Sequence, residues 1–465
     1  MPISHVTNGV HAPTWVAPEM SALAEREVGT DLSETPPDSS DIAASGGAER
    51  VPAGELWSVR GLLRARLVAD ARSRVRRSWQ QRGASGAELG WVDSILDPEV
   101  LTIGFARRVP SYKRLTLMLR DPDRLRSLLL HPDRPVQLVI AGKAHPADEG
   151  GKRLIQELVR FADAPAVRHR IVFLPNYDIE MAQTLYPGCD VWLNNPLRPL
   201  EACGTSGMKA ALNGCLNLSV LDGWWDEMFD GRNGWAIPTA DGVSDADHRD
   251  ALEASALYDL LEKTVAPLFY DQDADEVPAR WIEMVRHTLR TLGPKVQANR
   301  MVRDYVEGLY IPASLSAKAL DADFKGAREL AVWKSRVRSA WGGVRVDHVE
   351  SSGVADAPEV GGTLELRAFV SLGSLSPEDV DVQLVHGRVD AADQLTDSSV
   401  ASLRLDETFE GGRHRYVGEV ALDRPGPFGY TCRVVPRHEL VTGIGDLGLA
   451  ALPGESAGMA TGDLR

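Results

Sequence analysis

The sequence predicts a doubly wound α/β domain that is followed by a small all-β domain. Between Val100 and Pro238, short apolar runs alternate with helical stretches. These runs are continuous, as in strands that are buried on both faces of a parallel sheet. After Gly342-Gly343 the runs instead alternate apolar and polar residues, which is typical of antiparallel strands with one solvated face.

The first domain is expected to cover residues 1–342. Residues 20–50 are rich in Glu, Asp, Ser, Pro, Gly and Ala, which predicts a mobile surface insertion. From Leu56 to Gln81 the pattern predicts an amphipathic surface helix whose many arginines face solvent. Helical patterns also fill residues 250–341. Five apolar runs predict the strands of the parallel sheet: 101–105, 136–140, 171–174, 191–193 and 216–221.

The second domain is expected to be a β-sandwich-like module over residues 343–452, followed by a disordered polar tail at 453–465. Five runs with period two predict its strands: 344–346, 363–367, 380–385, 414–417 and 430–434.

Composition excludes several classes of protein. The 465 residues are enough for two or three domains. A formal net charge of −15 argues against general binding to nucleic acid or to an anionic membrane, and the sequence contains no apolar run of about 20 residues. The four cysteines form no CxxC pair, so we expect no metal site and a reducing, cytoplasmic location.

The densest motif runs from Pro199 to Gly214 and reads PLEACGTSGMKAALNG. Gly204, Thr205 and Ser206 precede a helix-forming stretch, where free backbone N–H groups attract an anion such as phosphate. A helix that starts near Thr205 would place Lys209, four residues later, on the same face. This lysine can neutralise a phosphate or form a Schiff base with an aldehyde cofactor; an incidental solvated lysine has the same spacing.

A second motif, GFARRVPSYKR at residues 104–114, leaves a predicted strand at its carboxyl end. Its four cations, which can surround a multiply charged oxyanion, lie at the edge where doubly wound sheets bind ligands. The alternative is a basic turn that pairs with surface carboxylates. Three further stretches can line the same cleft or simply pack: 7–15, 141–146 and 221–227. For the two tryptophans of the last stretch we favour packing.

Together these motifs resemble the α-glucan (glycogen, starch and maltodextrin) phosphorylases, in particular their bacterial branch. TNGVHAPTW, ARRVPSYKR, GKAHP, FLPNYD and EACGTSGMKAALNG occur in the order of the family across residues 1–240. The resemblance implies a Rossmann-like C-terminal lobe of a GT-B glycosyltransferase. It also implies pyridoxal 5′-phosphate (PLP) as cofactor, with an α-1,4-glucan and inorganic phosphate converted to glucose 1-phosphate.

The resemblance also assigns residue roles. Lys209 would form the Schiff base, and Arg108 and Lys113 would bind the substrate phosphate. The remaining implied contacts are to the cofactor, from Gly204, Thr205, Ser206, Arg107, Tyr177 and Trp15, and to the sugar, from Asn8, Glu201, Cys203 and Gly204. Cys203 replaces the usual serine of the motif, which weakens its expected contact to the sugar.

The family has a complete N-terminal lobe ahead of the TNG motif, whereas this chain starts a few residues before it. We therefore expect the C-terminal part of a phosphorylase that is incomplete alone and needs a separate N-terminal lobe as partner. Two alternatives stay open: a catalytically silent module that binds PLP or glucan, and a nucleotide-sugar GT-B glycosyltransferase. The Lys209 motif argues against the second.

Overall fold

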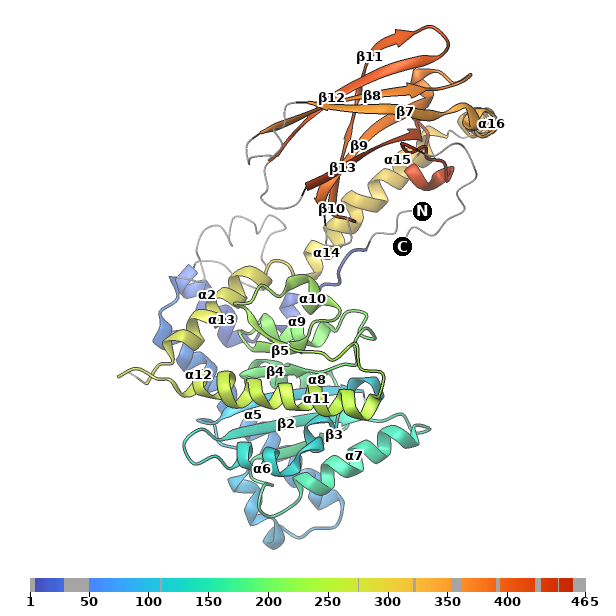
Figure 1. The fold of residues 1–465 in the computed structure, drawn as a ribbon. Helices are drawn as coiled ribbons and strands as arrows, with labels where there is room; N and C mark the ends of the chain where they lie inside the picture. Colours follow the sequence, from blue (N-terminus) through green and yellow to red (C-terminus); the bar gives the residue numbers. More distant parts are fainter. Residues whose placement is uncertain are drawn as a thin grey trace. The chain divides into compact units, whose positions relative to one another are not determined.

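In the computed structural model the chain divides into two compact units, which are Val6–Tyr305, here called the α/β unit, and Met1–His5 with Val306–Arg465, here called the β unit (Figure 1). The structure describes residues 5–28, 50–108, 111–274, 276–320, 323–352, 362–389, 394–422, 428–441 and 443–454.

The α/β unit is built on a six-stranded parallel sheet with the strand order β3-β2-β1-β4-β5-β6. The order reverses between β1 and β4, which creates the switch point where doubly wound sheets bind ligands. The five predicted strands are confirmed, and a sixth, β6, follows them. The strands are β1 (Leu101–Arg108), β2 (Val136–Lys143), β3 (Ile171–Pro175), β4 (Val191–Asn194), β5 (Leu216–Val220) and β6 (Gly234–Ile237).

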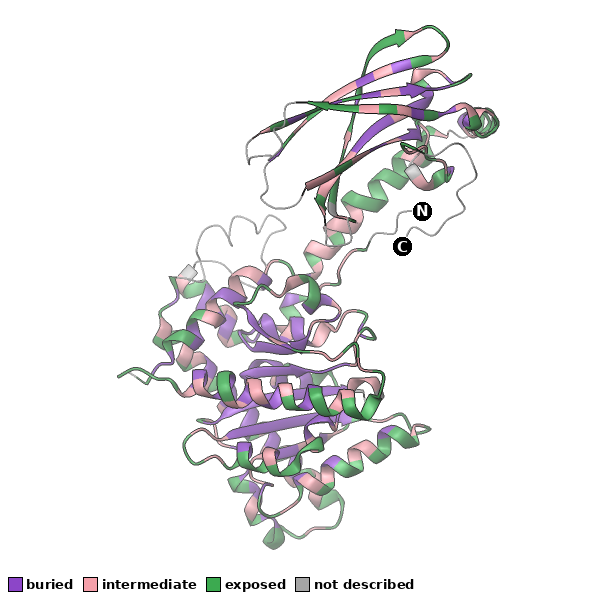
Figure 2. Ribbon diagram, in the orientation of Figure 1, coloured by how far each residue is buried: buried purple, intermediate pink, exposed green. Residues whose placement is uncertain are grey.

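Helices cover both faces of this sheet, so the strands are buried almost throughout, as the purple ribbon of Figure 2 shows. Two apolar clusters fill the space between strands and helices. The helices that matter for the site are α1 (Ala12–Trp15), α2 (Pro18–Val28), α5 (Ala53–Gln81), α8 (Ile179–Gly188), α9 (Thr205–Ala211), α10 (Trp224–Met228), α11 (Ala246–Leu260), α13 (Ala279–Leu292) and α14 (Ala298–Tyr305).

Helix α5 confirms the predicted helix, but the prediction that its arginines face solvent is wrong for two of them. The side chains of Arg60 and Arg64 are only 1% and 2% exposed. Both face Asp190, which precedes β4: Arg64 Nη1 lies 2.9 Å and Arg60 Nη2 3.5 Å from its Oδ1. The other carboxylate oxygen of Asp190 accepts the backbone N–H of Thr102 at 3.0 Å. A buried ion cluster therefore joins α5 to the centre of the sheet.

The expected mobile insertion at residues 20–50 also needs correction where the structure describes it. Residues 18–28 form helix α2, with Met20 and Leu23 each only 2% exposed in the main apolar core. Apolar side chains spaced three apart on one helix face explain why this polar-looking segment orders. Residues 29–49 lie outside the described residues.

The β unit contains two antiparallel sheets, ordered β10-β9-β13 and β11-β12-β8-β7. Residues of both sheets share one apolar cluster with Trp333 and Val337 of α16 (Lys325–Ala340). Helix α16 thus packs in the core of the β unit, whereas the predicted boundary at 342 placed it in the first domain; the two units divide at residue 305. The strands are β7 (Arg345–Ser352), β8 (Thr363–Ser371), β9 (Val380–Val389), β10 (Leu395–Ser402), β11 (Arg404–Phe409), β12 (Arg413–Ala421) and β13 (Phe428–Pro436). Of the predicted tail, 455–465 lies outside the described residues.

Candidate functional site

The carboxyl ends of β1 and β4 place a buried arginine at the switch point of the sheet. Arg107 is 8% exposed. Its guanidinium lies over the ring of Phe105, 4.6 Å from the centroid, and its Nη2 donates to Asn194 Oδ1 at 2.5 Å. Strand pairing thus brings two residues that are 87 positions apart into direct contact.

The other two nitrogens of this guanidinium, Nε and Nη1, have no hydrogen-bond partner among the residues that the structure describes. Burial lowers the pKa of Arg107 to about 10, so the group is still cationic at neutral pH. A buried cation with unused donors costs free energy unless an anion compensates it. The geometry therefore indicates an anion site beside Arg107.

Lys209 of α9 lies close to two aromatic rings. Its ammonium nitrogen is 4.0 Å from the ring centroid of Trp15 and 5.6 Å from that of Tyr186. Burial lowers the pKa of Lys209 from its usual value, which increases the fraction of neutral, nucleophilic amine. Trp15 and Tyr186 meet edge to face at 5.7 Å. The lysine is therefore held in an aromatic pocket rather than free in solvent.

A chain of aromatic contacts connects Lys209 to Tyr177 and to Ser206 at the start of α9. The hydroxyls of Tyr177 and Tyr186 lie 2.6 Å apart, and Tyr186 packs on Trp192 with 4.5 Å between centroids. Trp192 Nε1 donates to Ser206 Oγ at 3.2 Å. The structure thus brings together Trp15, Tyr177, Ser206 and Lys209, all of which the sequence singled out.

Asn213 attaches the Trp15 segment to α9. Its amide nitrogen donates to the carbonyl oxygens of Trp15 at 2.8 Å and Lys209 at 2.9 Å. Its amide oxygen accepts the backbone N–H of Ala17 at 2.7 Å. One buried side chain therefore satisfies both backbones and fixes the indole of Trp15 beside the lysine.

Helix α9 begins at Thr205, as the motif predicts, and Gly204 occupies the N-cap position with a φ of +85°. A side chain at this position would be strained, and a Cβ there would lie 3.1 Å from Glu201 Oε1. Gly204 thus allows the loop to turn tightly over Glu201. The first backbone N–H groups of α9 follow directly after this turn.

Glu201 and Lys113 form an ion pair in which both side chains are largely buried. The backbone N–H of Glu201 donates to Asp222 Oδ2 at 3.0 Å, which fixes the loop at the end of β5. Burial, and next the charge of Arg107, lowers the pKa of Lys113 to about 7, and the charge of Asp222 opposes this shift. Lys113, predicted to bind the substrate phosphate, and Glu201, predicted to bind the sugar, thus lie in direct contact.

Asn8 and Cys203 form the next part of the same edge. Burial raises the pKa of the Cys203 thiol, and hydrogen bonds with Asn8 oppose this shift. The carbonyl oxygen of Asn8 accepts from Arg300 Nη2 of α14 at 3.0 Å. Both residues are at least partly accessible, as a site for a sugar requires.

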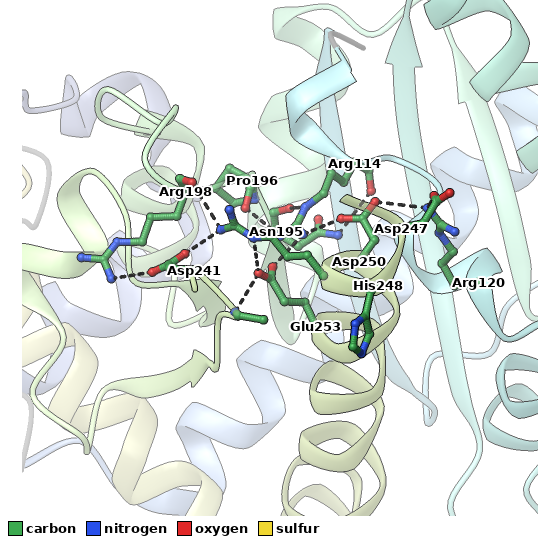
Figure 3. A network of polar contacts seen from close by, with 12 residues as sticks. Arg114, Arg120, Asn195, Pro196, Arg198, Asp241, Asp247, His248, Asp250 and Glu253 are labelled. Carbon is green, nitrogen blue, oxygen red and sulfur yellow. Dashed lines mark hydrogen bonds and ion pairs between the residues drawn. The ribbon is translucent and has the colours of Figure 1, made fainter. Parts of the chain in front are cut away.

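Figure 3 shows the network that anchors the loop between β4 and α9. Arg114 donates to the carbonyl oxygens of Asn195 at 2.9 Å and Pro196 at 2.8 Å, and it pairs with Asp250 and Glu253 of α11 at 3.0 and 2.6 Å. Arg114 thus makes four contacts, two with backbone carbonyls of the loop and two with carboxylates of α11. The network therefore makes the loop ahead of Glu201 a rigid support.

The structure leaves parts of the prediction untested and adds residues that it missed. Arg108 ends β1, but its side chain lies outside the described residues. Trp224 and Trp225 are at most 2% exposed, which confirms packing. Sequence reasoning missed Tyr186 and Asn194; the only signal for Asn194 was its position directly after an apolar run.

Among the described helices, none combines the length and the apolar composition that a membrane-spanning segment needs.

The fold and the site define an α/β protein whose doubly wound sheet carries two buried or half-buried cations, Arg107 and Lys209, among aromatic side chains at its carboxyl edge. Comparison with known proteins identifies the family. A family model described as carbohydrate phosphorylase matches residues 94–231, and one described as glycogen phosphorylase C-terminal domain matches residues 341–454.

Relatives with curated names extend this match along the chain. A glycogen phosphorylase of Mycobacterium tuberculosis is 56% identical over 453 residues, which are 97% of this chain and 52% of that protein. A maltodextrin phosphorylase of Thermococcus litoralis is 36% identical over 448 residues, 94% of this chain and 51% of that protein. A glycogen phosphorylase of Aquifex aeolicus is 42% identical over 309 residues, 66% and 44% of the two chains.

The chain belongs to the α-glucan phosphorylase family. It spans about half the length of the curated relatives it matches.

Proposed function

We propose that this chain is the cofactor-binding and phosphate-binding part of a PLP-dependent α-glucan phosphorylase, an enzyme that converts an α-1,4-glucan and phosphate to glucose 1-phosphate. One observation carries the proposal: a buried Arg107 with two unused donors and a half-buried Lys209 against Trp15 both lie near Tyr186. An anion and an amine-linked group are the two things this pair of cations can hold together.

The residues present fit the proposed cofactor. Lys209 supplies an amine with a lowered pKa, which covalent attachment of an aldehyde needs. Arg107 supplies a buried positive charge for the cofactor phosphate, and Thr205 and Ser206 stand at the first turn of α9. Trp15 and Tyr177 form the walls of the site. When bound, PLP would supply a phosphate group that exchanges protons with the substrate phosphate.

The residues around this site would bind and orient the substrates. A substrate phosphate would compete with Glu201 for Lys113, with Arg108 as a second cation at the end of β1. Glu201, released in part from Lys113, would accept hydrogen bonds from glucose hydroxyls, with Asn8, Cys203 and Gly204 along the same edge. Buried polar groups of this kind discriminate between sugars because an unmatched partner leaves them unpaired.

The wider architecture is part of the proposal. We infer a GT-B arrangement, with this α/β unit as its C-terminal lobe and an N-terminal lobe as the partner that supplies the other wall of the cleft. The relatives' length, about twice the matched span, supports this partner. Four free cysteines support the reducing location that we propose, the cytoplasm.

Two measurements test the function. The first is incubation of the chain with PLP, reduction with borohydride, and mass spectrometry of the peptide that contains residue 209. We expect a pyridoxyl adduct there, and none in Lys209→Ala. A chain that acquires no adduct after reconstitution refutes the cofactor assignment, and protection of the fold by a nucleotide sugar in its place would favour a nucleotide-sugar transferase.

The second measurement is release of glucose 1-phosphate from maltodextrin and phosphate. It is run with the chain alone and with the chain plus a separately expressed N-terminal lobe of a relative. Activity only in the mixture supports the proposed partner, since catalysis needs groups fixed on both sides of the reacting sugar. Activity of the chain alone refutes that requirement, and a PLP-loaded but inactive mixture favours a silent binding module.

A further inference from the structure

We propose that Asn194 is a positioning residue that holds Arg107 so that its unused Nε and Nη1 donors are kept for the cofactor phosphate. This inference rests on the proposed function. Asn194 lies at the end of β4 and makes no described hydrogen bond to Lys209 or α9. It would affect the affinity for the cofactor through Arg107.

The hydrogen bonds around Asn194 fix which way its amide points. Asn194 Nδ2 lies 2.9 Å from Ser219 Oγ, and Ser219 Oγ in turn lies 2.9 Å from the carbonyl oxygen of Val220. A carbonyl can only accept, so the serine hydroxyl donates its one proton to that carbonyl oxygen. The hydroxyl must then accept from the amide nitrogen. The amide oxygen therefore faces Arg107, with no freedom to rotate by 180°.

This relay is also rigid. Asn194 is 4% exposed and Ser219 is 1% exposed. The backbone next to Asn194 is anchored because the carbonyl oxygen of Asn195 accepts from Arg114. Because its oxygen, its nitrogen and the neighbouring backbone are all hydrogen-bonded, the buried amide has one orientation, and this orientation fixes the position of Arg107 Nη2.

The position of Arg107 follows from two contacts. Phe105 supports one face of the guanidinium and Asn194 occupies Nη2, while Nε and Nη1 are left buried without a partner among the described residues. Without the amide oxygen, the guanidinium can rotate toward other carbonyls, for example that of Leu193, which Nη2 already approaches at 3.5 Å. Asn194 thus reserves the charge of Arg107 for an anion.

The test compares the affinities of the full chain for PLP and for pyridoxal, which has the aldehyde but no phosphate. Both are measured by titrating the near-ultraviolet absorbance of the lysine-bound form. Leucine has nearly the shape of asparagine and no polar atoms. We expect Asn194→Leu to weaken PLP binding about 10- to 100-fold, the loss of one hydrogen bond to a charged group, and to leave pyridoxal binding unchanged.

Two variants separate positioning from simple destabilisation. Asn233→Leu removes an equally buried amide whose described hydrogen bonds are to Met228 and Asp230 and not to Arg107 or α9, so it should lower stability but leave both affinities unchanged. In an Arg107→Met background, Asn194→Leu should weaken PLP binding no further. Ser219→Ala, which frees the amide to rotate, should weaken PLP but not pyridoxal binding by a smaller factor.

The outcomes are distinguishable. If the wild-type chain binds PLP more tightly than pyridoxal and Asn194→Leu changes neither affinity, or changes both equally, the positioning role is refuted while the proposed cofactor stands. An additive loss in the Arg107→Met background refutes it as well. If the wild-type chain binds PLP no more tightly than pyridoxal, the proposed phosphate site and the inference both fail.

Discussion

Replacing Asp190 by asparagine should strongly destabilise the α/β unit. The aspartate side chain is fully buried and receives three groups: Arg64 and Arg60 on Oδ1, and the backbone N–H of Thr102 on Oδ2. Asparagine keeps the volume, so no cavity forms, but it removes the charge and turns one acceptor into a donor. Either Arg64 or Thr102 then faces an N–H group.

The size of this effect follows from the buried ion cluster. Removing one partner of a buried pair typically costs about 3–5 kcal/mol because it leaves an uncompensated charge. Arg60 has carbonyl acceptors at Pro187 and Asn213, whereas the Nη1 of Arg64 depends on Asp190. We therefore expect the lower half of that range, about 3–4 kcal/mol, which is a large part of the 5–15 kcal/mol that stabilises a typical domain.

The assay is urea unfolding at pH 7, followed by tryptophan fluorescence. Of the eleven tryptophans, all except Trp333 and Trp341 lie in the α/β unit, so the signal reports mainly on that unit. The matched control is Asp70→Asn on α5, which breaks the partly exposed pair with Arg74 and should cost about 1 kcal/mol or less. A loss below about 1.5 kcal/mol for Asp190→Asn, or one equal to that of the control, would refute the reasoning.

Three further predictions concern other parts of the chain. Asp379→Asn should destabilise the β unit by about 1.5–3 kcal/mol in thermal unfolding at pH 7. Although burial alone would raise the pKa of Asp379, hydrogen bonds from Arg336, Ser376 and Trp333 hold it well below its usual value. The stabilisation by the ionised carboxylate is therefore present above about pH 4. The difference in stability between wild type and variant should become smaller as the pH falls further. A gap that stays the same at acid pH contradicts this. Gly104→Ala should cost about 1–3 kcal/mol in urea unfolding, because a Cβ there would lie 2.5 Å from Cys189 Sγ; an unchanged midpoint contradicts it. Because burial lowers the pKa of Lys209, the rate of PLP incorporation should rise about tenfold per pH unit and level off below pH 10.5; levelling off only above that value would contradict it.

The sequence was sufficient to predict the parts of the fold that depend on local pattern. Apolar runs predicted five strands of the parallel sheet, and the glycine- and hydroxyl-rich segment at 204–207 predicted that a helix begins near Thr205, where α9 starts. The charge pattern of the GFARRVPSYKR motif placed Arg107 and Lys113 at the carboxyl edge. In each case neighbouring residues alone carry the signal.

The features that the sequence did not predict depend on contacts between distant segments. Arg60 and Arg64 look like solvated helix residues, and only their contact with Asp190, about 126 positions away for Arg64, reveals that they are buried. Asn194 gains its partners from β1 and β5 in the same way. Helix α16 was assigned to the first domain because a helical pattern does not show which core its tryptophan fills.

The link from Asn213 to Trp15 joins residues 198 positions apart. During synthesis, the indole that covers Lys209 emerges long before the lysine and the amide that hold it. At about 5–20 residues per second, roughly 10–40 s separate the two events. The Trp15 segment can therefore take its place in the pocket only after α9 and Asn213 have been synthesised.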